Sequence, residues 1–141
     1  MYHHILVAIE NSKADDAIME HIAGLAKLTG AKLLLVHVAD GFAARHFEDL
    51  NLRESEEIRE DRAYLARRCE ELRAAGLQVD SQLAMGDPAT QLIRIAGEAK
   101  VDLIAMSTHG HRLLGDIIHG TTVDRVRHIV CMPVLLLRGQ T

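Results

Sequence analysis

The sequence predicts an α/β fold with an open five-stranded parallel sheet and helices on both faces. Short apolar runs rich in Val, Ile and Leu alternate with longer segments of helical periodicity along the chain. Most of these runs lack the apolar–polar alternation of half-exposed strands, which is typical of strands buried on both faces. With 141 residues and no repeat or linker, we expect a single domain over residues 1–141.

The sequence predicts five strands and four helices in alternation along the chain. Residues 78–84 alternate apolar and polar side chains, which places that strand nearest a sheet edge. Residues 39–52 have no firm periodicity and are expected to form a loop or the frayed start of a helix. The expected strands are residues 4–9, 32–38, 78–84, 101–106 and 134–138, and the expected helices are the segment between Ser12 and Gly30 and residues 55–75, 88–99 and 121–130.

Capping residues define the ends of these helices. Ser12, with Asp15 three residues later, resembles a short capping box at the start of the first helix. Gly30 stands where a left-handed residue commonly ends a helix. Asp87 and Pro88 are the N-cap and first-turn residues of another helix. The Glu and Arg residues of the long helix at 55–75 are expected to form a solvated face.

Composition excludes several classes of function. The formal net charge of −4 gives no electrostatic footprint for nucleic acid or for an anionic membrane surface. The N-terminus lacks the basic and long apolar regions of a signal peptide, and no apolar run reaches the length of a membrane span. The two cysteines have no zinc or redox spacing and are expected to be buried and reduced. These features favour a cytoplasmic protein.

The segment between the fourth strand and the last helix has the composition of an anion-binding loop. It contains Gly110 and Gly120, which allow close backbone approach to a ligand, and the cation Arg112. Thr121 and Thr122 are expected to begin the last helix, where free N–H groups and the helix dipole favour a phosphate. The alternative is that Gly120 and Thr121 only cap this helix.

Other interpretations of this loop fit less well. Residues 115–122 have the glycine spacing of a P-loop, but Thr121 stands where that motif needs Lys. His109, His111 and His119 have no acidic or cysteine partner at ligand spacing, so we do not predict a protein metal site. Ser107 lies near two histidines without an acid to orient a base. No catalytic residue is therefore predicted, and slow ATP hydrolysis is the most that we expect.

The chain resembles the universal stress protein family from Met1 to Arg138. The nucleotide-binding members carry a glycine, two residues, a glycine, nine residues, and then glycine with Ser or Thr. Ser107, Gly110, Gly120 and Thr121 match this pattern, except that Ser replaces the first glycine. The segments ILVAIENS, GDPA and MPVLLL agree with the resemblance. It implies a Rossmann-like fold of the adenine nucleotide alpha hydrolase-like type.

The resemblance implies that ATP, AMP or cyclic AMP binds in a cleft at the carboxyl ends of the strands. Mg²⁺ or Mn²⁺ would be carried by the phosphates. It also implies a homodimer that pairs the final strands, here from Val134 to Leu137. The residues implied to bind the nucleotide are Ala8, Ile9, Glu10, Val38, Met106, Ser107, Gly110, His111, Arg112, Gly120, Thr121, Thr122 and Val123.

Two residues depart from the family pattern, and two other functions stay open. Glu10 stands where the family usually has Asp, which extends the carboxylate by one methylene group, and Ser107 adds a hydroxyl group. Neither change removes the expected phosphate contacts. The alternatives are a nucleotide-free dimeric interaction or regulatory protein of the same fold, and a slow ATP hydrolase.

Overall fold

Five parallel strands form one sheet in the order β3-β2-β1-β4-β5, which confirms the predicted fold class. The computed structural model describes residues 1–40, 47–108 and 114–138, and for residues 40, 47–55 and 114–120 only the backbone is described. The strands are β1 (His4–Ala8), β2 (Lys32–Asp40), β3 (Val79–Gly86), β4 (Leu103–Thr108) and β5 (Val134–Arg138). As predicted, β3 lies at a sheet edge.

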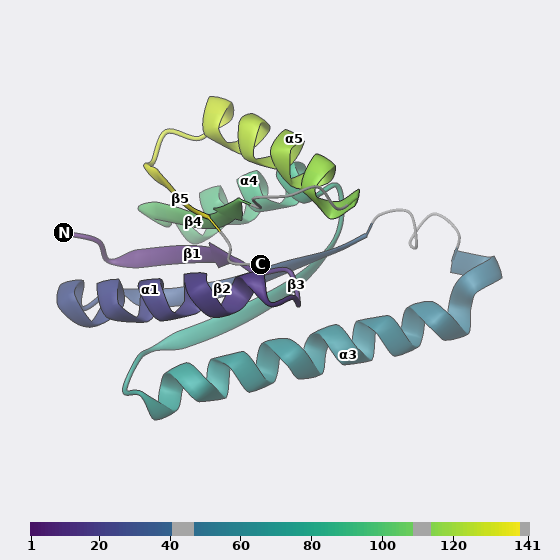
Figure 1. The fold of residues 1–141 in the computed structure, drawn as a ribbon, viewed down its shortest axis with the longest axis horizontal. Helices are drawn as coiled ribbons and strands as arrows, with labels where there is room; N and C mark the ends of the chain where they lie inside the picture. The colour runs from purple at the N-terminus through teal and green to yellow at the C-terminus, as the bar shows by residue number, and fades with distance from the viewer. Residues whose placement is uncertain (41–46, 109–113, 139–141) are drawn as a thin grey trace.

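Helices cover both faces of this sheet (Figure 1). Helices α1 (Ala14–Thr29) and α3 (Phe47–Ala74) lie on one face, and α4 (Pro88–Ala99) and α5 (Leu114–Ile129) on the other. Successive strand residues point to opposite faces. In β1, Ile5 and Val7 therefore join the core beneath α1 and α3, whereas Leu6 joins the core beneath α4 and α5.

The helix caps agree in part with the sequence analysis. Asp87 is the N-cap of α4, and its carboxylate accepts hydrogen bonds from the Thr90 backbone N–H at 2.9 Å and from the Thr90 hydroxyl group at 2.6 Å. Gly30 ends α1 with a left-handed φ of 76°. The N-cap of α1, however, is Lys13 and not Ser12. The Asp15 carboxylate nevertheless accepts a hydrogen bond from the Ser12 backbone N–H at 3.3 Å, as the predicted capping box requires.

Two helices begin earlier than predicted. Helix α3 begins at Phe47, within the segment expected to be a loop or frayed helix start. Helix α5 begins at Leu114, so the predicted helix start at Thr121 was wrong. In the sequence, Leu114 is followed by isoleucines three and four residues later, a helical spacing that continues across Gly120. A glycine inside a helix costs only about 1 kcal/mol relative to Ala, so it need not mark a boundary.

The two cysteines differ in their surroundings. Cys69 of α3 is buried, as expected, and burial raises the pKa of its thiol group. Cys131 is exposed, in contrast to the expectation. It lies in the short connection between α5 and β5. Among the described residues, no helix is long and apolar enough to cross a membrane.

Candidate functional site

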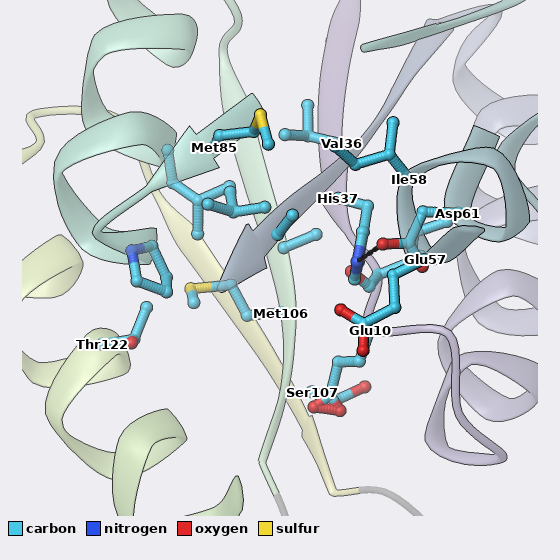
Figure 2. A pocket seen from close by; sticks show the side chains of 16 residues that line it. Glu10, Val36, His37, Glu57, Ile58, Asp61, Met85, Met106, Ser107 and Thr122 are labelled. Atoms are coloured by element: carbon cyan, nitrogen blue, oxygen red, sulfur yellow. Dashed lines mark hydrogen bonds and ion pairs between the residues drawn. The ribbon is translucent and has the colours of Figure 1, made fainter. Parts of the chain in front are cut away.

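A cavity of about 430 Å³ opens at the carboxyl ends of the central strands (Figure 2). Strand order reverses between β1 and β4, and ligands of open α/β sheets bind at such a switch point. The floor of the cavity is apolar, and its polar groups gather on the side of β1 and α3. The described lining residues are Ala8, Ile9, Glu10, Val36, His37, Val38, Ala39, Glu57, Ile58, Asp61, Met85, Pro88, Leu92, Met106, Ser107 and Thr122.

Seven residues predicted from the sequence line this one cavity. They come from the ends of β1, β2 and β4 and from α5, which lie far apart in the chain. Their convergence follows from parallel pairing, because β1 contacts both β2 and β4 in register. These seven residues are Ala8, Ile9, Glu10, Val38, Met106, Ser107 and Thr122.

The other predicted residues lie elsewhere or outside the described residues. Val123 is buried in the core beneath α4 and α5, and Thr121 is exposed. Gly120 lies within α5. The predictions for Gly110, His111 and Arg112 fall outside the described residues.

The early start of α5 changes the proposed role of Gly120 and Thr121. In an α-helix each N–H group beyond the first four donates to the carbonyl four residues before it. Because α5 begins at Leu114, the amide groups of Thr121 and Thr122 belong to its interior and are not the free donors expected at a helix start. The cavity meets α5 instead through Thr122, whose side chain is buried.

The turn after β1 is held by a buried carboxylate, that of Asp15. Asp15 is fully buried and accepts hydrogen bonds from the backbone N–H groups of Glu10 at 2.9 Å, Asn11 at 2.8 Å and Ser12 at 3.3 Å. Asn11 has a left-handed φ of 63°, which this set of bonds stabilises. The turn carries Glu10 into the cavity, so Asp15 determines where that side chain begins.

Tyr64 connects this turn to helix α3. Its buried hydroxyl group donates to Asp15 Oδ2 at 2.5 Å. Burial raises the pKa of the Asp15 carboxyl group, and the hydrogen bonds from Tyr64 and from the turn oppose that rise. Burial and the adjacent carboxylate also raise the pKa of Tyr64 above its ordinary value. From the sequence, Asp15 was predicted only as a capping residue, and Tyr64 was not predicted to have a role.

Helix α3 forms a cavity wall that was not predicted from the sequence. Its residues Glu57, Ile58 and Asp61, one turn apart, line the cavity. His37 of β2 joins this wall to the sheet, because its Nε2 lies 3.3 Å from Asp61 Oδ2 and its Nδ1 lies 2.9 Å from the carbonyl oxygen of Ile9. The only sequence signal for this wall is the single apolar Ile58 between charged neighbours.

On the opposite side, α4 and α5 are joined by an ion pair. Arg125 of α5 donates to Asp87 Oδ2 at 2.6 Å and to Thr90 Oγ1 at 3.2 Å. This pair connects the helix that contributes Thr122 to the helix that contributes Pro88. In the described ranges, no group of three or more His, Cys, Asp or Glu side chains could hold a metal ion directly.

The doubly covered parallel sheet and the cavity at its switch point define this chain as an α/β protein with a candidate ligand site at the carboxyl ends of its strands. The sequence model of the universal stress protein family matches residues 1–138. The chain therefore belongs to the universal stress protein family, and the resemblance found in its motifs is confirmed.

Relatives of this chain span nearly its whole length. A universal stress protein of Methanocaldococcus jannaschii is 25% identical, over 98% of this chain and 96% of its own. Its solved structure matches with a TM-score of 0.84, over 100% of this chain and 99% of that one. A structure from Archaeoglobus fulgidus in complex with dAMP has 21% identity and a TM-score of 0.71, over 96% of this chain and 97% of that one. A universal stress protein in complex with cAMP has 19% identity and a TM-score of 0.69, over 97% of each chain.

Proposed function

We propose that this protein binds ATP or a related adenine nucleotide, such as AMP or cyclic AMP, in the cavity at the carboxyl ends of β1, β2 and β4. The observation that carries the proposal is the convergence of seven predicted residues on one cavity of about 430 Å³. That volume lies within the range of small-molecule sites, which are mostly apolar with a few placed polar groups. Structural relatives in complex with dAMP and cAMP support the same ligand class.

The base and the sugar would occupy different parts of the cavity. The base would lie on the apolar floor, against Val38 and Met106. The sugar hydroxyl groups would face the carboxylate of Glu10. The phosphates would extend toward Thr122 and toward Gly110, His111 and Arg112, and Mg²⁺ or Mn²⁺ would enter with them.

Thermal unfolding with ATP, AMP or cyclic AMP tests this proposal. A ligand present at one hundred times its Kd stabilises the folded state by about 2.7 kcal/mol. For a chain of this size, that should raise Tm by roughly 8–10 °C. Unchanged Tm with all three nucleotides, together with no nucleotide in the purified protein, would favour a nucleotide-free interaction protein instead.

A pair of glycine variants locates the ligand. Gly120→Val is expected to abolish the nucleotide-dependent rise in Tm, because a branched side chain at this position hinders the approach of the phosphates. Gly97→Val is the matched control, since Gly97 is exposed within α4 and a Cβ there meets nothing within 4 Å. Both variants make the same change in intrinsic helix propensity, which is slightly more favourable for Val than for Gly. Equal nucleotide affinity in the two variants would place the ligand elsewhere.

We also propose a homodimer through the final strand, from Val134 to Leu137. Strand β5 lies at a sheet edge, and Leu136 is 38% exposed there. An exposed edge strand can pair with a second copy of itself. Leu136→Lys should shift sedimentation equilibrium toward the monomer, whereas Leu28→Lys, at an exposed leucine of α1, should not. A wild-type protein that sediments as a monomer at micromolar concentration would exclude the dimer.

A further inference from the structure

Met85 of β3 brings an exposed thioether side chain to the cavity. It lines the cavity together with Ala39, its partner in the register of β2 and β3. The Met85 side chain is 38% exposed, whereas Met106, which also lines the cavity, is 2% exposed. Among the large apolar side chains that the structure describes as exposed, Met85 is the one that lines the cavity. A reagent in solution therefore reaches Met85 more readily than Met106.

Oxidation makes a methionine side chain polar while leaving its carbon skeleton unchanged. With hydrogen peroxide, a lone pair of the sulfur forms an S–O bond, the O–O bond breaks, and the departing hydroxide takes up a proton to leave as water. The thioether is oxidised by two electrons and the peroxide is reduced by two. The product, methionine sulfoxide, is polar and chiral, and methionine sulfoxide reductases restore the thioether.

The described lining of the cavity offers few partners to a sulfoxide oxygen at Met85. This oxygen accepts hydrogen bonds and therefore needs an N–H or O–H donor. Apart from the carboxyl groups, the described lining side chains that carry such donors are those of His37, Ser107 and Thr122. Both ring nitrogens of His37 already face oxygen atoms of other residues. Figure 2 shows Met85 well separated from Ser107 and Thr122, so neither side chain is placed to donate to it.

We propose that Met85 is a site of reversible oxidation and that its sulfoxide form weakens nucleotide binding in the cavity. This inference rests on the proposed nucleotide function and adds a regulation of that same site. A ligand that covers Met85 would exclude water from the sulfoxide oxygen without replacing its hydrogen bonds. Because burying a polar group without a partner is unfavourable, we expect the Kd for AMP to rise about tenfold, equivalent to ~1.4 kcal/mol.

Treatment with hydrogen peroxide, followed by peptide mass spectrometry and calorimetric titration with AMP, tests the proposal. Every protein carries Cys131→Ser, because the exposed Cys131 thiol group also reacts with peroxide. Met85 should be oxidised severalfold faster than Met106. Saturating AMP should slow the oxidation of Met85 but not that of Met1, which is exposed and precedes β1, at the end of the sheet opposite the cavity. The two methionine sulfoxide reductases together should reverse the rise in Kd.

The ratio of the Kd for AMP after and before treatment is compared between two variants. Met85→Leu removes the thioether, so its ratio should stay near one. Met132→Leu is the matched control, because Met132 packs against the core beneath α4 and α5 and does not line the cavity, so its ratio should remain about ten.

Three outcomes would overturn the proposal. Oxidation of Met85 no faster than that of Met106 would refute the modification site. A ratio near one in the protein with Met85 oxidised, or an equal rise in Met85→Leu, would refute its effect on binding while nucleotide binding stands. If the untreated protein binds neither AMP, ATP nor cyclic AMP, the proposed function is refuted together with that effect, whereas the mass spectra still decide whether Met85 is oxidised preferentially.

Discussion

Replacing Tyr64 with Phe tests whether the hydrogen bond between α3 and the β1–α1 turn stabilises the fold. The variant removes one hydroxyl group and retains the ring, which packs in the core beneath α1 and α3. Asp15 then loses its bond from Tyr64 and keeps the three backbone bonds of the turn. Nothing else in the described contacts of Tyr64 depends on its hydroxyl group.

The expected loss follows from the surroundings of the bond. Tyr64 is 8% exposed and Asp15 is 0% exposed, so water cannot easily replace the missing donor. A hydrogen bond to a charged group contributes ~1.5–3 kcal/mol. Because Asp15 retains three donors, we expect the free energy of unfolding to fall by about 2 kcal/mol, within that range. For a chain of this size, that corresponds to a decrease in Tm of roughly 6–8 °C.

Urea unfolding followed by circular dichroism measures this loss, with Tyr2→Phe as the matched control. Tyr2 also packs partly against the core, but no hydrogen bond from its hydroxyl group is found in the described part of the chain. The control should therefore change the free energy of unfolding by less than ~0.5 kcal/mol. A Tyr64→Phe variant as stable as the control would refute a stabilising role for the bond to Asp15.

Three further outcomes are expected. In urea unfolding, Gly30→Ala should destabilise the protein by about 1 kcal/mol, because the φ of 76° at Gly30 disfavours a side chain. Gly24→Ala should instead stabilise it by ~0.5–1 kcal/mol, because Gly24 lies inside α1 and a Cβ there meets nothing within 4 Å. Asp87→Ala should cost about 1 kcal/mol at neutral pH. The hydrogen bonds from the side chain and backbone of Thr90 lower the pKa of Asp87, so this cost should be present above pH 3.8 and disappear as the pH falls through the lowered folded-state pKa. Because the pKa of Tyr64 is raised, its contribution to the free energy of unfolding should be complete below pH 10 and lost in stronger alkali. In the Tyr2→Phe variant, the rise in absorbance at 295 nm that reports tyrosine ionisation should therefore accompany unfolding. Ionisation of Tyr64 before unfolding would contradict this prediction.

Most of the fold could be predicted because its signals are local. Runs of Val, Ile and Leu define strands buried on both faces, and Gly30 and Asp87 mark helix ends through their own backbone or side-chain chemistry. The start of α5 could not be predicted in this way. Glycine with a following threonine is a common helix start, and Gly120 and Thr121 have that local pattern although the helix begins at Leu114.

The sheet side of the cavity and Thr122 of α5 were predicted, but the wall formed by α3 was missed. Ends of parallel strands must meet at one edge, so Glu10, Val38 and Met106 could be grouped from sequence. No comparable rule predicts which face of helix α3 contacts the cavity. Glu57 and Asp61 are charged like the exposed residues around them, and only the packing of α3 against β2 and β3 brings them to the cavity.

The central position of β1 has a consequence for how the chain acquires its structure during synthesis. β1 pairs with β4 through Ile5 and Leu103, so one of its two edges stays open until nearly one hundred further residues have been made. Contacts this distant in sequence slow folding, and an open apolar edge can join another nascent chain. A ribosome-bound chain that ends before β4 should therefore be a preferred client of chaperones, and extending it through β4 should release it.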